Sequence, residues 1–137
     1  MFVPEPVFVV RAVASSEVLD AMTVEAGAVL RVAPDEVLVL DAVLADVETA
    51  LAADSHAIVI DDTSWMAITV ALDAGRELFA RTASWPLPAE GFAQGMVAGL
   101  AVKVVVGESA VRFLVQRAVV DELVERFEEL GDVGSTT

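Results

Sequence analysis

The sequence of 137 residues contains no cysteine and no tyrosine, and it has one histidine and one lysine. Without cysteine, disulfides, thiolate nucleophiles and thiolate metal sites are excluded. Zinc sites of the usual His/Cys kind are excluded as well, because His56 is the only imidazole. No glycine-rich phosphate loop or dinucleotide fingerprint is present. The sequence therefore predicts no catalytic residue, no metal site and no cofactor site in this chain.

Basic residues are also scarce. Eight Lys and Arg stand against 22 Asp and Glu, which gives a formal net charge of −14. A phosphate backbone or an anionic membrane would repel such a surface, so neither nucleic acid nor membrane is an expected partner. The acid excess is compatible with a solvated surface or with a docking face for a basic partner.

Long hydrophobic runs are missing. The longest uncharged run, residues 91–102, is too short and too rich in glycine to span a bilayer. The first six residues have no basic region and contain Glu5 and two prolines, unlike a signal peptide. We therefore expect a soluble, cytoplasmic protein.

Apolar residues are abundant, at 56% of the chain, and predict one folded domain over residues 1–137. Runs of β-branched residues predict strands at 7–13, 29–32, 36–40, 57–60, 65–72, 96–106 and 111–116. Helical spacing predicts helices after Asp41 and Asp73, each capped by that aspartate, and over 117–130. Residues 17–24 fit a strand or a short helical turn. The fold class that follows is α+β, a mostly antiparallel sheet with helices packed on one face.

The connections carry further expectations. Pro34 predicts a hairpin turn between 29–32 and 36–40, and the polar run 61–64 predicts pairing of 57–60 with 65–72. Trp65 and Phe127 are expected in the core, and residues 131–137 form a flexible tail.

Residues 83–95 form a long connection with two prolines and two glycines. Long loops in small domains are often functional, so Trp85, Leu87 and Phe92 are candidate partner-docking residues. The alternative is that this loop wraps its own sheet and buries all three side chains.

The remaining polar groups give weak chemical signals. His56 could pair with Ser55 or Ser64 as a base and nucleophile, but neither serine lies in a nucleophile elbow. Asp61 and Asp62 could bind a cation, although such residues more often bond their own backbone in a turn. Neither pattern predicts a site.

Several segments, taken in order, carry one resemblance. Residues 31–40 (RVAPDEVLVL) resemble the R-x-x-P-D-E-W-L-L-L hairpin of the gamma subunits of sarcosine oxidases. Residues 57–64, 72–78, 87–95 and 112–130 are similar to later segments of that family. The match departs at Val37, where the family favours Trp, at Asp73, where Gly-Pro is usual, and at 86–88 (PLP) in place of Asp-Leu; no Thr follows Gly95.

The resemblance implies a single folate-binding-domain-like unit, related to the aminomethyltransferase of glycine cleavage, with a core of about residues 29–130. It implies a non-catalytic accessory subunit of a heterotetrameric, flavin-dependent complex of amine catabolism that oxidises sarcosine or a related N-methyl amine. FAD, FMN, NAD and tetrahydrofolate would belong to larger subunits. The alternatives are a stand-alone module that binds folate or another small ligand, and a minor hydrolase built on Ser64 and His56.

Overall fold

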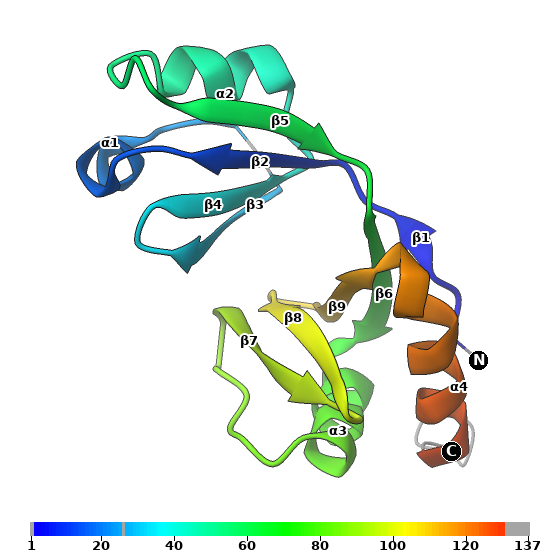
Figure 1. Cartoon of the computed structure of the whole chain (residues 1–137). Helices are drawn as coiled ribbons and strands as arrows, with labels where there is room; N and C mark the ends of the chain where they lie inside the picture. The colour runs from blue at the N-terminus through cyan, green and yellow to red at the C-terminus, as the bar shows by residue number, and fades with distance from the viewer. Residues whose placement is uncertain (1, 26, 131–137) are drawn as a thin grey trace. The chain divides into compact units, whose positions relative to one another are not determined.

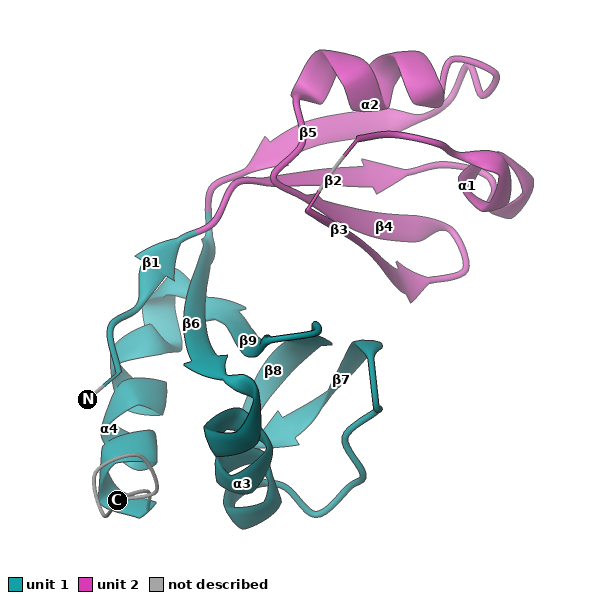
Figure 2. Cartoon of the chain, turned by 180° about the vertical axis from the view of Figure 1, so that it is seen from behind, with its two compact units in different colours: residues 1–6, 64–137 teal, residues 7–63 magenta. Residues whose placement is uncertain are grey.

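The computed structural model describes residues 2–25 and 27–130 (Figure 1). The chain forms two compact units, residues 1–6 with 64–137 and residues 7–63 (Figure 2). Both sheets are antiparallel and both carry helices, which confirms the predicted α+β class. The tail predicted at 131–137 lies outside the described residues, and the single domain expected from the sequence stays a prediction.

The unit of residues 7–63 is a four-stranded sheet with two helices on one face. Its strands lie in the order β3 (Ala28–Ala33), β4 (Glu36–Leu40), β2 (Val9–Val13) and β5 (Ile58–Asp62). Helices α1 (Ser16–Ala21) and α2 (Leu44–Ala50) bury Leu19 and Val47 in a cluster with Val10 and Val39. Alternation along the strands thus places one apolar row under the helices.

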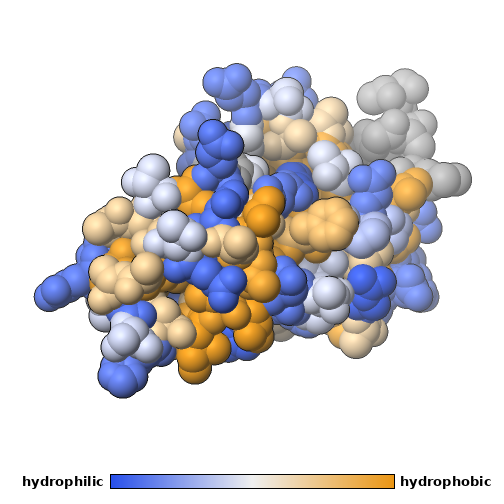
Figure 3. Space-filling view, turned by 90° about the horizontal axis from the view of Figure 1, so that it is seen from above, coloured by the Kyte–Doolittle hydropathy of each residue, from blue (hydrophilic) through white to orange (hydrophobic). Residues whose placement is uncertain are grey.

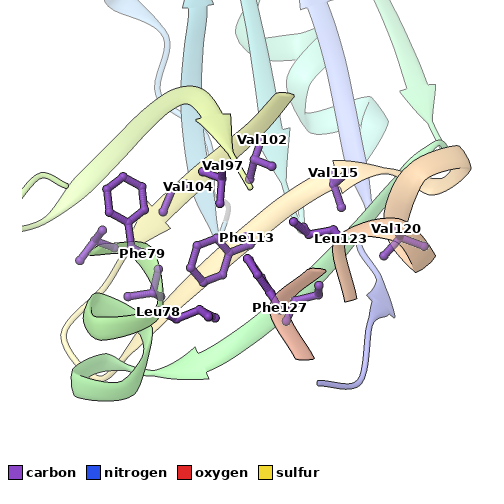
Figure 4. Close-up of a cluster of buried hydrophobic side chains, with 13 residues drawn as sticks. Leu78, Phe79, Val97, Val102, Val104, Phe113, Val115, Val120, Leu123 and Phe127 are labelled. Carbon is purple, nitrogen blue, oxygen red and sulfur yellow. The ribbon is translucent and has the colours of Figure 1, made fainter. Parts of the chain in front are cut away.

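The unit of residues 1–6 and 64–137 is a five-stranded sheet with the other two helices. Its strands lie in the order β1 (Glu5–Pro6), β6 (Trp65–Ala71), β9 (Ala110–Gln116), β8 (Leu100–Val106) and β7 (Gly91–Val97). Helix α3 is Leu72–Thr82, and a 3-10 turn at Arg117–Val119 (η1) leads into α4 (Val120–Leu130). Phe113 of β9 lies between Leu78 of α3 and Phe127 of α4 in the core of this unit (Figure 4). Trp65 and Phe127 are both buried, as predicted.

Several predicted elements are confirmed in place. Residues 28–40 form an antiparallel hairpin around Pro34. The ambiguous stretch 17–24 contains a helix, α1, whose N-cap Ser15 accepts a hydrogen bond from Val18 N at 3.3 Å. The strand at 111–116 and the final helix also lie where their patterns indicated.

Both predicted aspartate caps are wrong. Asp41 continues the ladder between β2 and β4 through its backbone N–H, has φ 58°, and precedes the actual cap Val43. Helix α3 begins two residues earlier than expected, so Ala71 is its cap and Asp73 lies in the first turn. A carboxylate there still favours the helix N-terminus through its dipole, which explains the sequence signal.

The predicted pairing of 57–60 with 65–72 is also wrong. Strand β5 pairs with β2, whereas β6 pairs with β1 and β9. Asp61 and Asp62 therefore lie in β5 rather than in a turn, and the chain passes from one unit to the other at Thr63 and Ser64.

The predicted strand 96–106 is in fact the end of one strand, a turn and the whole of the next. Ala98 (φ 52°) and Gly99 (φ 80°) form a two-residue turn between β7 and β8. Positive φ at both positions is the geometry that suits the twist of a hairpin. Ala98 stands where Asn or Asp usually marks such a turn, so the sequence showed only an unbroken apolar run. The expected 83–95 loop is irregular only over residues 83–90, because β7 begins at Gly91.

Candidate partner-docking segment

Residues 83–90 join α3 to β7 and are fixed at both ends. Ala98 N donates to Thr82 O at 2.6 Å, and Ala83 N donates to Phe79 O at 2.9 Å, so the last turn of α3 is bonded to the β7–β8 turn. Farther along, Arg76 donates to Ala89 O at 2.6 Å. The segment is therefore held against its own unit by the backbone of α3 at one end and by the Arg76 side chain at the other.

Trp85 packs on the helix-bearing side of this unit. Its ring meets Phe79 edge-on, with centroids 4.7 Å apart, and its Nε1 donates to Met96 O at 2.8 Å. Gly95 allows this approach, since a Cβ there would lie 2.7 Å from Trp85 Cε2. Leu87 also packs against the same core, and both side chains are half-buried.

Phe92 lies on the other side of the sheet. Along β7, Val97 points into the core, so the alternating positions Phe92, Gln94 and Met96 face away from α3 and α4. Phe92 is half-buried and pairs with Val105 across β8. The structure thus brings Trp85 and Leu87 together and places Phe92 on the opposite face.

The other residues singled out in the sequence do not form a reactive group. His56 is exposed, and its backbone N–H donates to Asp54 Oδ1 at 2.9 Å. Arg81, which was not among them, forms an exposed ion pair with Glu77 on α3. In residues 2–25 and 27–130 no three His, Asp or Glu side chains gather as metal ligands would.

Surface apolar residues that sequence reasoning missed lie in the 7–63 unit. Phe8 is 79% exposed, and Ile58 and Ile60 on β5 are 60% and 47% exposed. Figure 3 shows hydrophobic residues reaching the surface among polar ones on the face that it presents. Phe8 and the isoleucines lie in apolar strand runs, and a run alone does not tell which side of a strand is covered.

The same unit is strongly acidic. Residues 7–63 contain eleven Asp and Glu and two Arg, a formal charge of −9. Both arginines form ion pairs with carboxylates of the same unit: Arg11 with Glu36 at 2.6 Å and Arg31 with Asp20 at 2.9 Å. The exposed apolar residues of the 7–63 unit therefore lie on a surface of net negative charge.

No protein-family model and no curated protein matches this sequence. Among solved structures, a chain of the heterotetrameric sarcosine oxidase from Corynebacterium sp. U-96, in complex with pyrrole 2-carboxylate, is similar with a TM-score of 0.70 and 16% identity. The match covers 94% of this chain and 85% of that chain, so the two are of similar length. At this identity the likeness shows a shared fold, and it agrees with the resemblance found in the sequence. No helix of the described residues is long and apolar enough to cross a bilayer.

Proposed function

We propose that this chain is a non-catalytic accessory subunit, of the gamma type, in a cytoplasmic flavin-dependent complex similar to sarcosine oxidase. The observation that carries the proposal is the match of fold over nearly the full length of two small chains. The sequence resemblance over residues 29–130 supports it independently. The complex would oxidise sarcosine or a related N-methyl amine, with FAD, FMN, NAD and tetrahydrofolate held by larger subunits.

The chain's own chemistry supports an accessory role. It has one histidine, no cysteine and no tyrosine, so apart from carboxylates it has few of the side chains that act as a general base or nucleophile. Its exposed phenylalanine and isoleucines are instead typical of a surface that another protein covers.

Co-expression with large flavoprotein subunits of the sarcosine oxidase type tests this proposal. We expect the chain to co-elute with them in size-exclusion chromatography, and the flavin absorbance to belong to the complex. The chain purified alone should be colourless. A near-stoichiometric flavin spectrum from the isolated chain would contradict an accessory role. Failure to assemble, together with saturable binding of tetrahydrofolate, would favour a stand-alone ligand-binding module.

Within this proposal, residues 83–90 with Phe92 are one docking element. Trp85 and Leu87 would stiffen it from inside, which lowers the entropy lost on binding, and Phe92 would supply contact area on the other face. Phe92→Ala should leave the melting temperature within a few degrees of the parent and weaken assembly. Met96→Ala is the matched control, because Met96 is 56% exposed on the same face of the same strand. If Phe92→Ala assembles as well as Met96→Ala, Phe92 does not lie in the interface.

A further inference from the structure

Strand β5 is an edge strand of the four-stranded sheet (Figure 1). Edge strands present unpaired N–H and C=O groups to which another strand can add. The hydrogen-bond pattern of β2 with its two neighbours shows which backbone groups of β5 point outward. Asp41 N donates to Phe8 O and Ala14 N donates to Asp35 O, so the even-numbered residues of β2 bond to β4. The odd-numbered residues of β2 then bond to β5.

This pattern determines which backbone N–H and C=O groups of β5 point away from β2. Arg11 pairs with Ile60, Val9 with Asp62 and Val13 with Ile58, so these β5 residues bond inward. Val59 and Asp61 consequently point their backbone groups away from β2. Within the described residues, nothing outside the sheet bonds to either backbone. Helix α2 covers the face of the sheet, where Val47 contacts the cluster around Val10 and Val39.

The other three edges carry features that hinder strand addition. Strand β1 has two residues, one of them Pro6. On β7, the Trp85 indole occupies the carbonyl of Met96. The β3 ladder shifts register between Arg31 and Ala33. Short length, proline, bulges, charged side chains and covering by other elements are means by which proteins protect their edges. Strand β5 has no proline and no bulge, and its two charged residues, Asp61 and Asp62, are both acidic, so its edge still suits a strand that carries basic side chains.

The side chains of β5 define the chemistry of what would bind. Ile58 and Ile60 project from the face opposite the helices, and both are largely exposed. Asp61 projects from the helix-bearing face and is exposed. A strand added here would meet apolar side chains on one face and a carboxylate on the other. A second copy of this chain is disfavoured, because two units of charge −9 would repel each other.

We propose that the outer edge of β5 accepts an extended segment of a partner subunit in which apolar and basic residues alternate, adding a fifth strand to this sheet. The proposal rests on the proposed function, since it names how the accessory chain binds a larger subunit. The apolar residues of that segment would lie beside Ile58 and Ile60, and its Lys or Arg side chains beside Asp61.

The first test uses amide exchange in the assembled complex. The amides of Val59 and Asp61 should exchange quickly in the free chain and be strongly protected in the complex. The amide of Ile60, bonded to β2 in both states, is the internal reference. Ile60→Lys should weaken assembly by roughly tenfold or more, the effect of about 1.4 kcal/mol. Val29→Lys is the matched control, because Val29 has the same 47% exposure on the opposite edge strand.

The second test uses the isolated chain with a blocked seven-residue peptide of alternating valine and lysine. We expect the peptide to shift the NMR signals of the Val59 and Asp61 amides and to slow their hydrogen exchange. A peptide of alternating valine and glutamate is the control and should have little effect. Asp61→Pro should abolish the response, since it removes an outward N–H and leaves the ladder to β2 intact. Asp61→Ala should only weaken it.

These tests separate the two proposals. A complex that forms without protecting Val59 and Asp61 overturns the edge proposal and leaves the accessory function standing. If no complex forms, the accessory function fails, and absence of protection by the valine–lysine peptide then overturns the edge proposal as well.

Discussion

Arg31 shows why the first segment of the sequence resemblance has its form. Its guanidinium donates to Ala33 O at 3.1 Å and Pro34 O at 2.7 Å, and it pairs with Asp20 of α1 at 2.9 Å. One planar group thus holds the β3–β4 turn and attaches α1 to it. The arginine at the start of that segment and the proline of its turn are linked by this contact.

Replacing Arg31 by Lys should therefore destabilise the protein. Lysine keeps the charge but cannot direct several donors in one plane, so hydrogen bonds to the turn or to α1 are lost. We expect the free energy of unfolding to fall by about 1–2 kcal/mol. Chemical denaturation measures this. Arg81→Lys is the control, because its pair with Glu77 is exposed, and it should change stability by less than about 0.5 kcal/mol.

Asp54 provides a pH-dependent contact. Its carboxylate accepts hydrogen bonds from Ser15 N at 2.7 Å and His56 N at 2.9 Å. These bonds, that from Ser15 first, lower the pKa of Asp54 below its ordinary value. A carboxyl whose pKa is lower in the folded state stabilises the fold fully above its unfolded pKa of about 4. This stabilisation is lost as pH falls from there through the lowered pKa.

Asp54→Asn should accordingly reduce stability near neutral pH and flatten the acid limb of the stability curve. Thermal melts from pH 7 to pH 2 measure both effects. Glu48→Gln, which removes a negative charge from an exposed position of α2 beyond its first turn, is the control. A parental acid limb in Asp54→Asn would show that the two backbone bonds do not stabilise the ionised form.

At the scale of elements, α3 contains a glycine that its packing requires. Gly75 is buried where α3 crosses β9, and a Cβ there would lie 2.8 Å from Val111. Ala normally stabilises a helix relative to Gly by about 1 kcal/mol. Here we expect Gly75→Ala to destabilise by roughly 1–3 kcal/mol, because overpacking outweighs propensity.

A double-mutant cycle checks this explanation. Val111→Gly removes both Val111 Cβ and Val111 Cγ2, each of which would lie 2.8 Å from the added Cβ, so Gly75→Ala should cost much less in that background. Additive losses in the double variant would mean that the contact with Val111 is not the cause.

Phe127 is the largest side chain that helix α4 buries against its sheet. The ring is fully buried and lies 5.0 Å from Phe113 and 5.4 Å from Phe2, centroid to centroid. Phe127→Ala should cost about 3–5 kcal/mol, as deletion of a buried aromatic ring does. Leu130→Ala, half exposed at the end of the same helix, should melt close to the parent. Equal melting of both variants would contradict the placement of α4 on the core.

Local patterns predicted most elements but not which strands pair. The hairpin at Pro34, the strand at 111–116 and the stripe of α4 were predictable because their signals lie within the element. The pairing of β5 with β2, some fifty residues earlier, has no local signal, and the sequence pattern favours the next strand along the chain instead. The turn at Ala98 was missed because alanine rarely adopts positive φ.

The candidate docking site was predictable only in part. Prolines and glycines predicted an irregular connection over residues 83–95, which is confirmed for residues 83–90, whereas Gly91 and Gly95 lie in β7. That Trp85 lies over Gly95 and Phe92 on the opposite face depends on where β7 begins, which the sequence did not locate. The exposed edge of β5 could not be found without the strand order.

At the scale of the whole molecule, residues 7–63 are an insertion between two paired strands. Strand β1 ends at Pro6 and β6 begins at Trp65, and these strands pair through Glu5 with Ala67 and Pro6 with Met66. Both ends of the inserted unit are therefore fixed in the sheet of the other unit. Closing this loop lowers the entropy of the inserted segment before it folds.

This connectivity predicts cooperative unfolding, in agreement with the single domain expected from the sequence. The inserted unit has 57 residues, a size at which a core alone gives marginal stability. It should lose its structure when β1 and β6 separate.

Both tryptophans lie in the other unit, so their fluorescence follows that unit alone, while methyl NMR signals of Val10 and Val39 follow the insertion. In a urea titration the two probes should give the same midpoint. Midpoints separated by more than the error of the fits would show two independently stable domains, and Pro6→Gly, which loosens β1, would then move only the transition reported by tryptophan.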